Sequence, residues 1–303
     1  MEEKKLLFIY NPRSGTGKIR SKLSDVIDMC VKEGYEVNVR PTQARMDAME
    51  YVKKNAGLYD KIICSGGDGT LDEVVKGILA GEHKVTVGYI PAGSTNDFAA
   101  SLGISSSTMK AAATALYGRP FRCDIGNFNE NIFVYVAAFG LFTDVSYATK
   151  QSTKNIMGHM AYVLEGIKSF SLGSTKSYSM SVITDNRIIK DEFVYGMISN
   201  SSSVGGFKAI PQEDVCLNDG EFEVLLVKYP RNLEELNSIT TSLLAQDSNP
   251  DYMYYFKTSS LEIRSEEEVA WTLDGENGGM HKEITITNVH EAFEICVPDK
   301  TIK

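Results

Sequence analysis

The fold is decided by one stretch of the sequence, Lys61-Ile-Ile-Cys-Ser-Gly66-Gly67-Asp68-Gly69-Thr70-Leu-Asp-Glu73. It starts as a short apolar strand, and three glycines within four positions then let the backbone turn tightly and approach a ligand closely. Thr70 with Glu73 three residues on predicts a capping box, so a helix is expected to begin just after the turn. A helix N-terminus at such a turn predicts a phosphate site, with tight packing of the turn as the alternative.

Asp68 makes the phosphate interpretation more specific. An acid beside bound phosphates is tolerable mainly if it holds Mg²⁺ or handles a proton. The carboxylate within the turn therefore favours a nucleotide site over a turn that is glycine-rich for packing alone.

Two more loops follow strand patterns, and they read Asn11-Pro-Arg-Ser-Gly-Thr-Gly-Lys18 and Pro91-Ala-Gly-Ser-Thr-Asn-Asp-Phe98. The first ends like a Walker loop, but Pro12 replaces the first glycine and Ile19 stands where Ser or Thr would ligate magnesium. Its hydroxyl and basic groups still suit a nucleotide phosphate, with a solvated loop as the alternative. Parallel strands would bring all three loops to one edge of a sheet, where α/β proteins bind ligands.

The order of strand and helix patterns predicts two domains. Up to residue 122 the patterns alternate, which is typical of an α/β domain with a parallel sheet. From 123 to 303 short strands follow one another, which predicts a β-sandwich-like domain. The expected strands are Leu6–Tyr10, Tyr35–Arg40, Lys61–Ser65, Val85–Ile90, Ile132–Ala138, Tyr178–Thr184, Phe193–Ser199, Phe222–Lys228, Leu261–Arg264, Val269–Leu273, Ile284–Thr287 and Phe293–Val297. The expected helices are Lys18–Lys32, Ala44–Asn55, Leu71–Leu79, Met109–Tyr117, Ile156–Lys168 and Leu233–Leu244.

Composition excludes several classes of protein. A net charge of -9 over 303 residues disfavours nucleic acid as a partner. Five scattered cysteines without a C-x-x-C pair argue against a disulfide framework or a structural zinc site. No signal peptide or apolar run of membrane-spanning length is present, so a soluble, cytoplasmic protein is expected. The basic segment Lys150–Lys176 is expected to be a surface helix or an edge that touches a membrane.

The three loops together resemble the diacylglycerol kinase catalytic family. The matching motifs are N-P-x-S-G-x-G-K at 11–18, G-G-D-G-T-L at 66–71 and P-x-G-S-x-N-D-F-A at 91–99. The resemblance continues through Arg122–Gly126, Asn200, Gly205-Gly206, Leu217–Phe222 and Leu273–Glu276, so it spans nearly the whole chain. It implies an α/β nucleotide domain over 1–122, a β-rich lipid-side domain over 123–303, and catalysis between the two.

The family's site residues carry over to matching positions in this chain. Asp68 would help hold Mg²⁺ on ATP, and Glu276 would be the general base that takes the proton of the lipid hydroxyl. A structural Mg²⁺ would be bound by Asp219 with main-chain oxygens near Cys216 and Glu221, and linked to Asp124; a plain surface turn is the alternative there. The nucleotide would be lined by Asn11, Pro12, Arg13, Ser14, Gly15, Thr42, Gly66, Gly67, Asp68, Gly69, Thr70, Leu71, Asp72, Ser94 and Asn96.

Three positions depart from the family pattern. Ser94 replaces the commoner Thr and keeps the hydroxyl. Asp72 replaces a frequent Asn and adds a negative charge beside the phosphate turn. The stretch Phe207–Asp214 lacks the usual M-A-P-x-A form, which affects the lipid-side surface and the structural metal more than the ATP site.

The expected activity is transfer of the γ-phosphate of ATP to a membrane lipid hydroxyl, diacylglycerol first, to give phosphatidic acid. The enzyme would touch the membrane peripherally during catalysis, and a homodimer fits the bacterial relatives. The G-G-D-G-T turn is shared with NAD kinases, so an NAD kinase stays open. A kinase for a sphingoid base or another lipid also stays open, as does a catalytically silent regulator that binds lipid or nucleotide.

Overall fold

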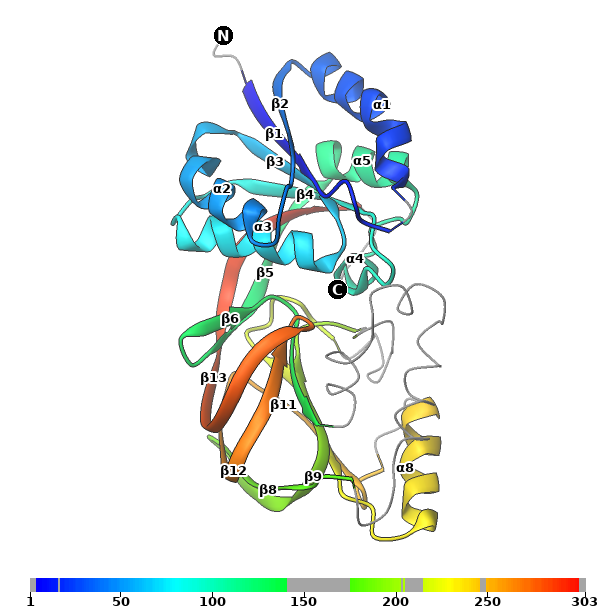
Figure 1. Cartoon of the computed structure of the whole chain (residues 1–303), viewed down its shortest axis with the longest axis vertical. Helices are drawn as coiled ribbons and strands as arrows, with labels where there is room; N and C mark the ends of the chain where they lie inside the picture. The colour runs from blue at the N-terminus through cyan, green and yellow to red at the C-terminus, as the bar shows by residue number, and fades with distance from the viewer. Residues whose placement is uncertain are drawn as a thin grey trace. The chain divides into compact units, whose positions relative to one another are not determined.

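The structure, a computed structural model, describes residues 4–15, 17–140, 175–202, 204, 215–245 and 249–299. The chain forms two compact units: unit 1 is Met1–Cys123 with Glu291–Lys303, and unit 2 is Asp124–His290. Two strands, β5 (Arg119–Phe128) and β13 (Glu276–Val297), run through both units (Figure 1). The sequence predicted a division after residue 122 and did not predict that the end of the chain belongs to unit 1.

Unit 1 is built on a parallel sheet in the order β4-β3-β1-β2. The strands are β1 (Lys4–Tyr10), β2 (Tyr35–Pro41), β3 (Lys61–Gly66) and β4 (Thr86–Pro91). The end of β13 adds a fifth strand, with Ile295 beside Val87 of β4. Leu6, Leu7, Phe8 and Ile9 are all fully buried, as expected for a parallel strand covered on both faces.

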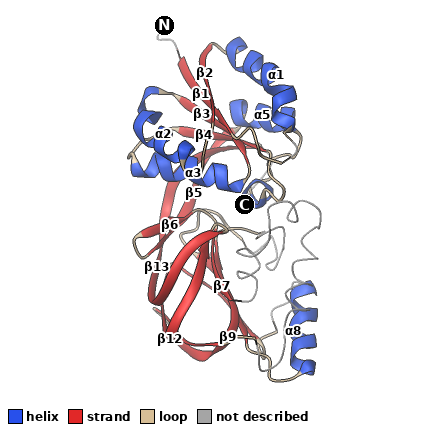
Figure 2. Cartoon of the chain, viewed as in Figure 1, coloured by secondary structure: helices blue, strands red, loops and turns tan. Residues whose placement is uncertain are grey.

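Helices cover both faces of this sheet (Figure 2). Helices α2 and α3 pack together on one face, while α1 and α5 pack together on the other. The bounds are α1 (Lys18–Lys32), α2 (Asp47–Asn55), the 3₁₀ turn η1 (Ala56–Leu58), α3 (Asp68–Ala80), α4 (Asp97–Ser101) and α5 (Thr108–Tyr117). The α/β prediction for the N-terminal part is confirmed. Because helices cover both faces of the sheet, the exposed loops of unit 1 lie at the carboxyl ends of its strands.

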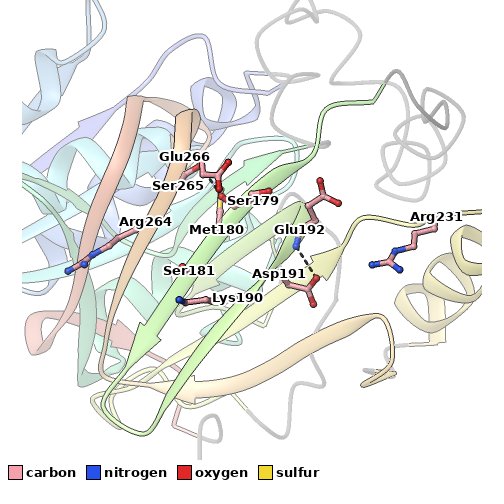
Figure 3. A pocket seen from close by; sticks show the side chains of 10 residues that line it. All are labelled: Ser179, Met180, Ser181, Lys190, Asp191, Glu192, Arg231, Arg264, Ser265 and Glu266. Carbon is pink, nitrogen blue, oxygen red and sulfur yellow. Dashed lines mark hydrogen bonds between the residues drawn. The ribbon is translucent and has the colours of Figure 1, made fainter.

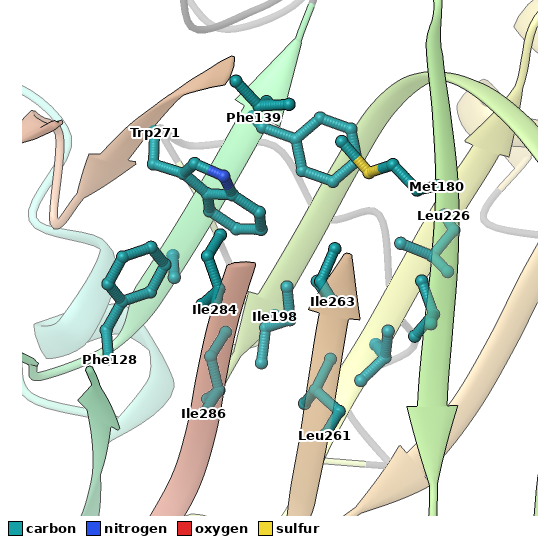
Figure 4. Close-up of a cluster of buried hydrophobic side chains, with 14 of the residues drawn as sticks. Phe128, Phe139, Met180, Ile198, Leu226, Leu261, Ile263, Trp271, Ile284 and Ile286 are labelled. Carbon is teal, nitrogen blue, oxygen red and sulfur yellow. The ribbon is translucent and has the colours of Figure 1, made fainter. Parts of the chain in front are cut away.

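Unit 2 is β-rich, as predicted, and its strands pair antiparallel; the sandwich arrangement stays a prediction. Its elements are β6 (Asn131–Phe133), β7 (Val136–Gly140), β8 (Tyr178–Thr184), β9 (Arg187–Ser199), β10 (Phe222–Lys228), α8 (Leu233–Ala245), β11 (Met253–Thr258) and β12 (Ser260–Leu273). Its core gathers aromatic and aliphatic side chains around Trp271 (Figure 4). The Trp271 ring lies 5.1 Å from that of Phe128 and 4.9 Å from that of Phe139.

Two strands are longer than the sequence predicted. The stretches 261–264 and 269–273 belong to one strand, β12, whose pairing register with β13 shifts between Arg264 and Val269. Exposed Glu266, Glu267 and Glu268 lie at this irregularity. Three consecutive charged residues interrupt the apolar strand pattern, so the sequence predicted two strands. In the same way, the pieces predicted at 284–287 and 293–297 are parts of β13.

Some predictions fall on residues that the structure does not describe. The predicted helix at 156–168, Gly205-Gly206 and the stretch 207–214 lie outside the described residues, as does most of the basic segment 150–176. Among the described helices, none is long and apolar enough to cross a membrane.

Candidate active site

The three Gly-rich loops meet at the carboxyl ends of β1, β3 and β4 in unit 1. The Asn11 N–H donates to the Ser65 carbonyl at 2.9 Å, which joins the first loop to the second. The Ala92 N–H donates to the Gly66 carbonyl at 2.7 Å, which joins the second to the third. Main-chain hydrogen bonds therefore gather the predicted nucleotide-binding residues around one point.

Glycine is required where these loops touch. A Cβ on Gly93 would lie 2.6 Å from the Gly67 Cα, so the second and third loops approach within the space of a methyl group. Gly15 has a φ of +53°, and a Cβ there would collide with the Ala92 carbonyl. Nothing lies within 4 Å of a Cβ on Gly69, so this glycine faces open space at the start of α3.

Asp68 connects the phosphate turn to the third loop. It is the first residue of α3, and its carboxylate accepts the main-chain N–H groups of Asp97 at 3.1 Å and of Phe98 at 3.3 Å. The Thr95 hydroxyl lies 3.5 Å from the same carboxylate. Asp68 thus holds the start of α4 in place, a role that the sequence did not reveal.

Asn96 shapes the third loop from within. Its side-chain oxygen accepts the Gly93 N–H at 2.8 Å, and its amide donates to the Gly93 carbonyl at 3.0 Å. Its backbone has a φ of 54°, the left-handed conformation that Asn tolerates well. The contacts of Asn96 make it a brace for the turn at Gly93.

The predicted capping box is wrong. Helix α3 begins at Asp68, with Gly67 as its N-cap, so Thr70 already lies inside the first turn. Glu73 accepts the main-chain N–H groups of Met46 at 2.8 Å and Ala48 at 3.1 Å, at the start of α2. The spacing of Thr70 and Glu73 fits a capping box. In the folded chain, however, Glu73 instead accepts the N–H groups at the start of α2, which have no partner within that helix.

Asp72 has an internal counter-ion. Its carboxylate is 2.8 Å from the Lys76 ammonium one helical turn on, and both side chains are mostly buried. The charge that departs from the family pattern is therefore neutralised within α3.

The remaining predicted nucleotide residues lie along the same edge of the sheet. The Thr42 N–H donates to the Tyr10 carbonyl at 2.8 Å, just beyond β2. Asn11 accepts the Arg13 N–H on its side-chain oxygen at 2.9 Å, which fixes the first turn. Leu71 is fully buried and Thr70 is buried, so these two side chains belong to packing.

On β4, the Tyr89 hydroxyl donates to the Gly66 carbonyl at 3.2 Å. Burial, with a further contribution from the nearby Asp68 charge, raises the pKa of Tyr89 well above its ordinary value. The phenol therefore stays protonated and supports the turn as a hydrogen-bond donor.

In unit 2, Glu276 follows a tight hairpin turn between β12 and β13. Asp274 and Gly275 both have positive φ, and Leu273 pairs with Glu276 across the turn. The Asp274 carboxylate is buried and accepts three main-chain N–H groups, from Val134 at 2.7 Å, Tyr135 at 2.9 Å and Val136 at 3.1 Å. Asp274 thus anchors the hairpin that carries exposed Glu276, a second role that the D-G-E motif did not indicate.

The residues predicted to bind a structural metal have other partners in unit 2. The Asp219 carboxylate is 2.9 Å from the Lys257 ammonium and accepts the Glu221 N–H at 3.1 Å. Asp124 is fully buried between His290 Nδ1 at 3.0 Å and the Gly220 N–H at 2.7 Å.

Lys257 and its neighbour Glu223 have shifted pKa values. Burial raises the pKa of Glu223 to about 7, although Lys257 opposes the shift. Burial lowers the pKa of Lys257, but the hydrogen bond with Asp219 and the charge of Glu223 outweigh it and raise the pKa above its ordinary value.

Two observations concern whether the described residues form a metal site or a further binding pocket. No group of three or more His, Cys, Asp or Glu side chains among the described residues is placed to hold a metal ion. An open hollow of about 620 Å³ in unit 2 is lined by residues of β8, β9 and β12 and by Arg231, among them Lys190, Asp191 and Arg264 (Figure 3). It contains none of the predicted site residues.

Comparison with known proteins assigns the family. A profile of the diacylglycerol kinase catalytic domain matches residues 5–128. A diacylglycerol kinase of Bacillus subtilis (strain 168) is 33% identical over 91% of this chain and 91% of the relative. A diacylglycerol kinase of Staphylococcus haemolyticus is also 33% identical, over 96% of this chain and 87% of the relative.

Solved structures share the fold. A diacylglycerol kinase structure from Bacillus anthracis str. Sterne has a TM-score of 0.76 at 22% identity and covers 100% of both chains. Another structure from this strain has a TM-score of 0.85 at 24% identity and covers 100% of this chain and 98% of its own. Identity over almost the full length, together with the catalytic-domain match, shows that the chain belongs to the diacylglycerol kinase family of ATP-dependent lipid kinases.

Proposed function

We propose that this chain transfers the γ-phosphate of ATP to the hydroxyl of diacylglycerol and so produces phosphatidic acid. The observation that carries the proposal is the meeting of three Gly-rich loops around the N-terminus of α3 in unit 1. The names of the relatives support diacylglycerol as the acceptor.

The nucleotide phosphates would lie over the first turn of α3. N–H groups at a helix N-terminus and the helix dipole favour an anion there. The open space above Gly69 lets phosphate oxygens come close to the backbone. Asn11–Gly15, Thr42, the main chain of Gly66–Asp72 and the loop with Ser94 and Asn96 would surround the rest of the nucleotide.

Mg²⁺ on ATP fits the donors near Asp68. Mg²⁺ usually takes one or two carboxylates plus substrate phosphates, so a cluster of three acids is not needed. Asp68 is partly exposed, and its carboxylate lies at the start of α3 beside the third loop. The ion would neutralise charge on the phosphates; Asp68 would hold it while also fixing the third loop.

Glu276 would act as the general base. Its carboxylate would take the proton of the acceptor hydroxyl as the oxygen attacks the γ-phosphorus, and ADP would leave with the electrons of the broken P–O bond. Anchoring of the hairpin by Asp274 would keep this carboxylate in a defined position. Since diacylglycerol stays in the bilayer, the enzyme would work in peripheral contact with a membrane.

Radiolabelled ATP with diacylglycerol in mixed micelles tests the proposal. We expect Glu276→Gln and Asp68→Ala each to lower kcat/KM by at least about 100-fold, the size typical of a lost catalytic group. Parallel assays with NAD and with sphingosine separate the alternative kinases. Phosphorylation of NAD alone, or full activity of both variants, would overturn the proposal.

The nucleotide half can be tested separately. A methyl group from Gly69→Ala meets no protein atom, so it should leave the unfolding free energy unchanged or slightly higher, yet raise the Kd for ATP by about tenfold if phosphate lies above it. Gly93→Ala is the contrasting variant, because its methyl group meets Gly67 and should weaken both folding and binding. Isothermal titration calorimetry and urea unfolding give the two readouts.

Size-exclusion chromatography with light scattering shows whether the homodimer implied by the resemblance forms.

A further inference from the structure

A buried polar cluster lies in unit 2 where β9, β10 and β11 run side by side. Glu223 of β10 pairs across the sheet with Ser199 of β9 and with Lys257 of β11. Glu223 and Ser199 are fully buried. The turn before β10 adds Asp219, so two carboxylates converge on one lysine.

Lys257 is placed as the shared cation of these acids. Its ammonium lies 2.9 Å from Asp219 Oδ2 and 3.3 Å from Glu223 Oε1. Its side chain is 30% exposed, and that of Asp219 is 27% exposed. Removing one partner of a charge pair shielded from water to this degree costs more than at the surface, because the remaining charge loses its compensation.

The neighbouring acid is also satisfied from within the protein. Asp124 Oδ1 faces His290 Nδ1, and Asp124 Oδ2 accepts the Gly220 N–H. Asp219 Oδ1 accepts the Glu221 N–H. All four carboxylate oxygens of these two residues therefore have a partner in the described part of unit 2.

This arrangement does not suit Mg²⁺. The ion demands near-octahedral oxygen ligands at about 2.0–2.1 Å, and an ammonium at hydrogen-bond distance from the same carboxylate both blocks that geometry and repels the ion. A lysine needs only acceptors at about 2.7–2.9 Å, which is what Asp219 supplies. The structural Mg²⁺ that the family resemblance implied is disfavoured by these contacts.

We propose that the Lys257 ammonium is the permanent counter-cation of Asp219, in place of a divalent metal ion, so that unit 2 needs no metal to fold. This inference is independent of the acceptor lipid and of the catalytic roles of Asp68 and Glu276. It concerns only the internal charge balance of unit 2.

Metal analysis and thermal unfolding of the wild-type protein without nucleotide give the first test. After dialysis against EDTA, millimolar Mg²⁺, Mn²⁺ or Ca²⁺ should change Tm by less than about 1 °C, whereas an ion bound at a hundred times its Kd would raise Tm by about 5 °C or more. Mass spectrometry of the protein as purified should find no stoichiometric metal. A bound ion that is lost in Asp219→Asn would overturn the proposal, even if lysine variants fail to fold.

Variants of the lysine give the second test. Lys257→Met should lower Tm by about 5 °C or more, because Asp219 loses its cation. Adding Asp219→Asn and Glu223→Gln together should recover most of that loss, since both carboxylates that shared the cation are then neutral. Lys228→Met, at a lysine of similar exposure whose nearest carboxylate is 3.8 Å away, is the matched control and should change Tm by about 1 °C. A Lys257→Met protein as stable as the control would contradict the proposal.

Discussion

Asp72 and Lys76 form an ion pair in the helix that follows the phosphate turn, and both are largely buried. Removing one partner of a buried pair is costly because the remaining charge loses its compensation. We expect Lys76→Met to lower the unfolding free energy by about 3 kcal/mol in urea titrations. The same variant should raise the KM for ATP by about tenfold, since an uncompensated Asp72 carboxylate would repel the phosphates.

The double variant Asp72→Asn with Lys76→Met is the control for this pair. It restores the Asn that the family often has at this position and removes both charges together, so it should recover most of the lost stability and of the ATP affinity. If the double variant is as impaired as Lys76→Met alone, packing of the lysine stem, and not its charge, accounts for the effect.

Glu223 makes folding depend on pH. Its pKa rises from an ordinary 4.5 to about 7 in the folded protein, chiefly through burial. Between these two values the folded state keeps a proton that the unfolded state releases, so the unfolding free energy falls as pH rises. The drop from this one group is about 3 kcal/mol by pH 8.

Urea unfolding at pH 5 and pH 8 measures this contribution against Glu223→Gln, which cannot ionise. The charged groups facing Glu223 are Asp219 and Lys257, and the pKa of Lys257 is raised above its ordinary value. The wild-type protein should lose about 3 kcal/mol more than the variant between the two pH values. Parallel pH dependence of the two proteins would mean that Glu223 does not titrate in this window.

At the scale of elements, the β12–β13 hairpin links a structural acid, Asp274, to the proposed general base, Glu276. Asp274→Asn replaces one of the two accepting oxygens with an N–H donor, which opposes the main-chain N–H groups of residues 134–136. We expect kcat to fall by at least about tenfold while the KM for ATP changes by less than about twofold, because the variant displaces Glu276 and leaves unit 1 intact.

Asn277→Ala on the same hairpin is the control for this prediction. Asn277 is exposed and accepts a hydrogen bond from the Gly279 N–H, so its loss should change kcat by less than about twofold. Equal losses in the two variants would show that the hairpin is sensitive to any change, and that Asp274 has no special positioning role.

The elements also separate the features that the sequence predicted from those that it missed. Strands and Gly-rich loops of unit 1 could be predicted because each is a local pattern in which apolar runs stop at glycines. The partner of Glu73, the cradle of N–H groups around Asp274 and the lysine beside Asp219 could not, since each depends on residues 25 or more positions away. The position of Lys257 beside Asp219 follows from the pairing register of β10 with β11. The adjacent residues Tyr254 and Tyr255 on β11 do not alternate between apolar and polar, so the sequence does not specify that register.

For the whole molecule, the division into two units predicts that nucleotide binding and the core around Trp271 can be separated. The three loops belong to unit 1, while Trp271 is fully buried in unit 2 against Phe128 and Phe139. Trp271→Ala should lower the unfolding free energy by about 3–5 kcal/mol through the cavity that it leaves. The Kd for ATP, measured by calorimetry well below the unfolding temperature, should change by less than about twofold.

Ile63→Ala is the matched core variant in unit 1. Ile63 is fully buried in β3, three residues before the phosphate turn at Gly66. Its loss should cost about 2–5 kcal/mol and also weaken ATP binding, because a cavity beneath β3 lets the turn shift. If Trp271→Ala weakens ATP binding as much as Ile63→Ala does, nucleotide binding depends on both units, and unit 1 does not build the site by itself.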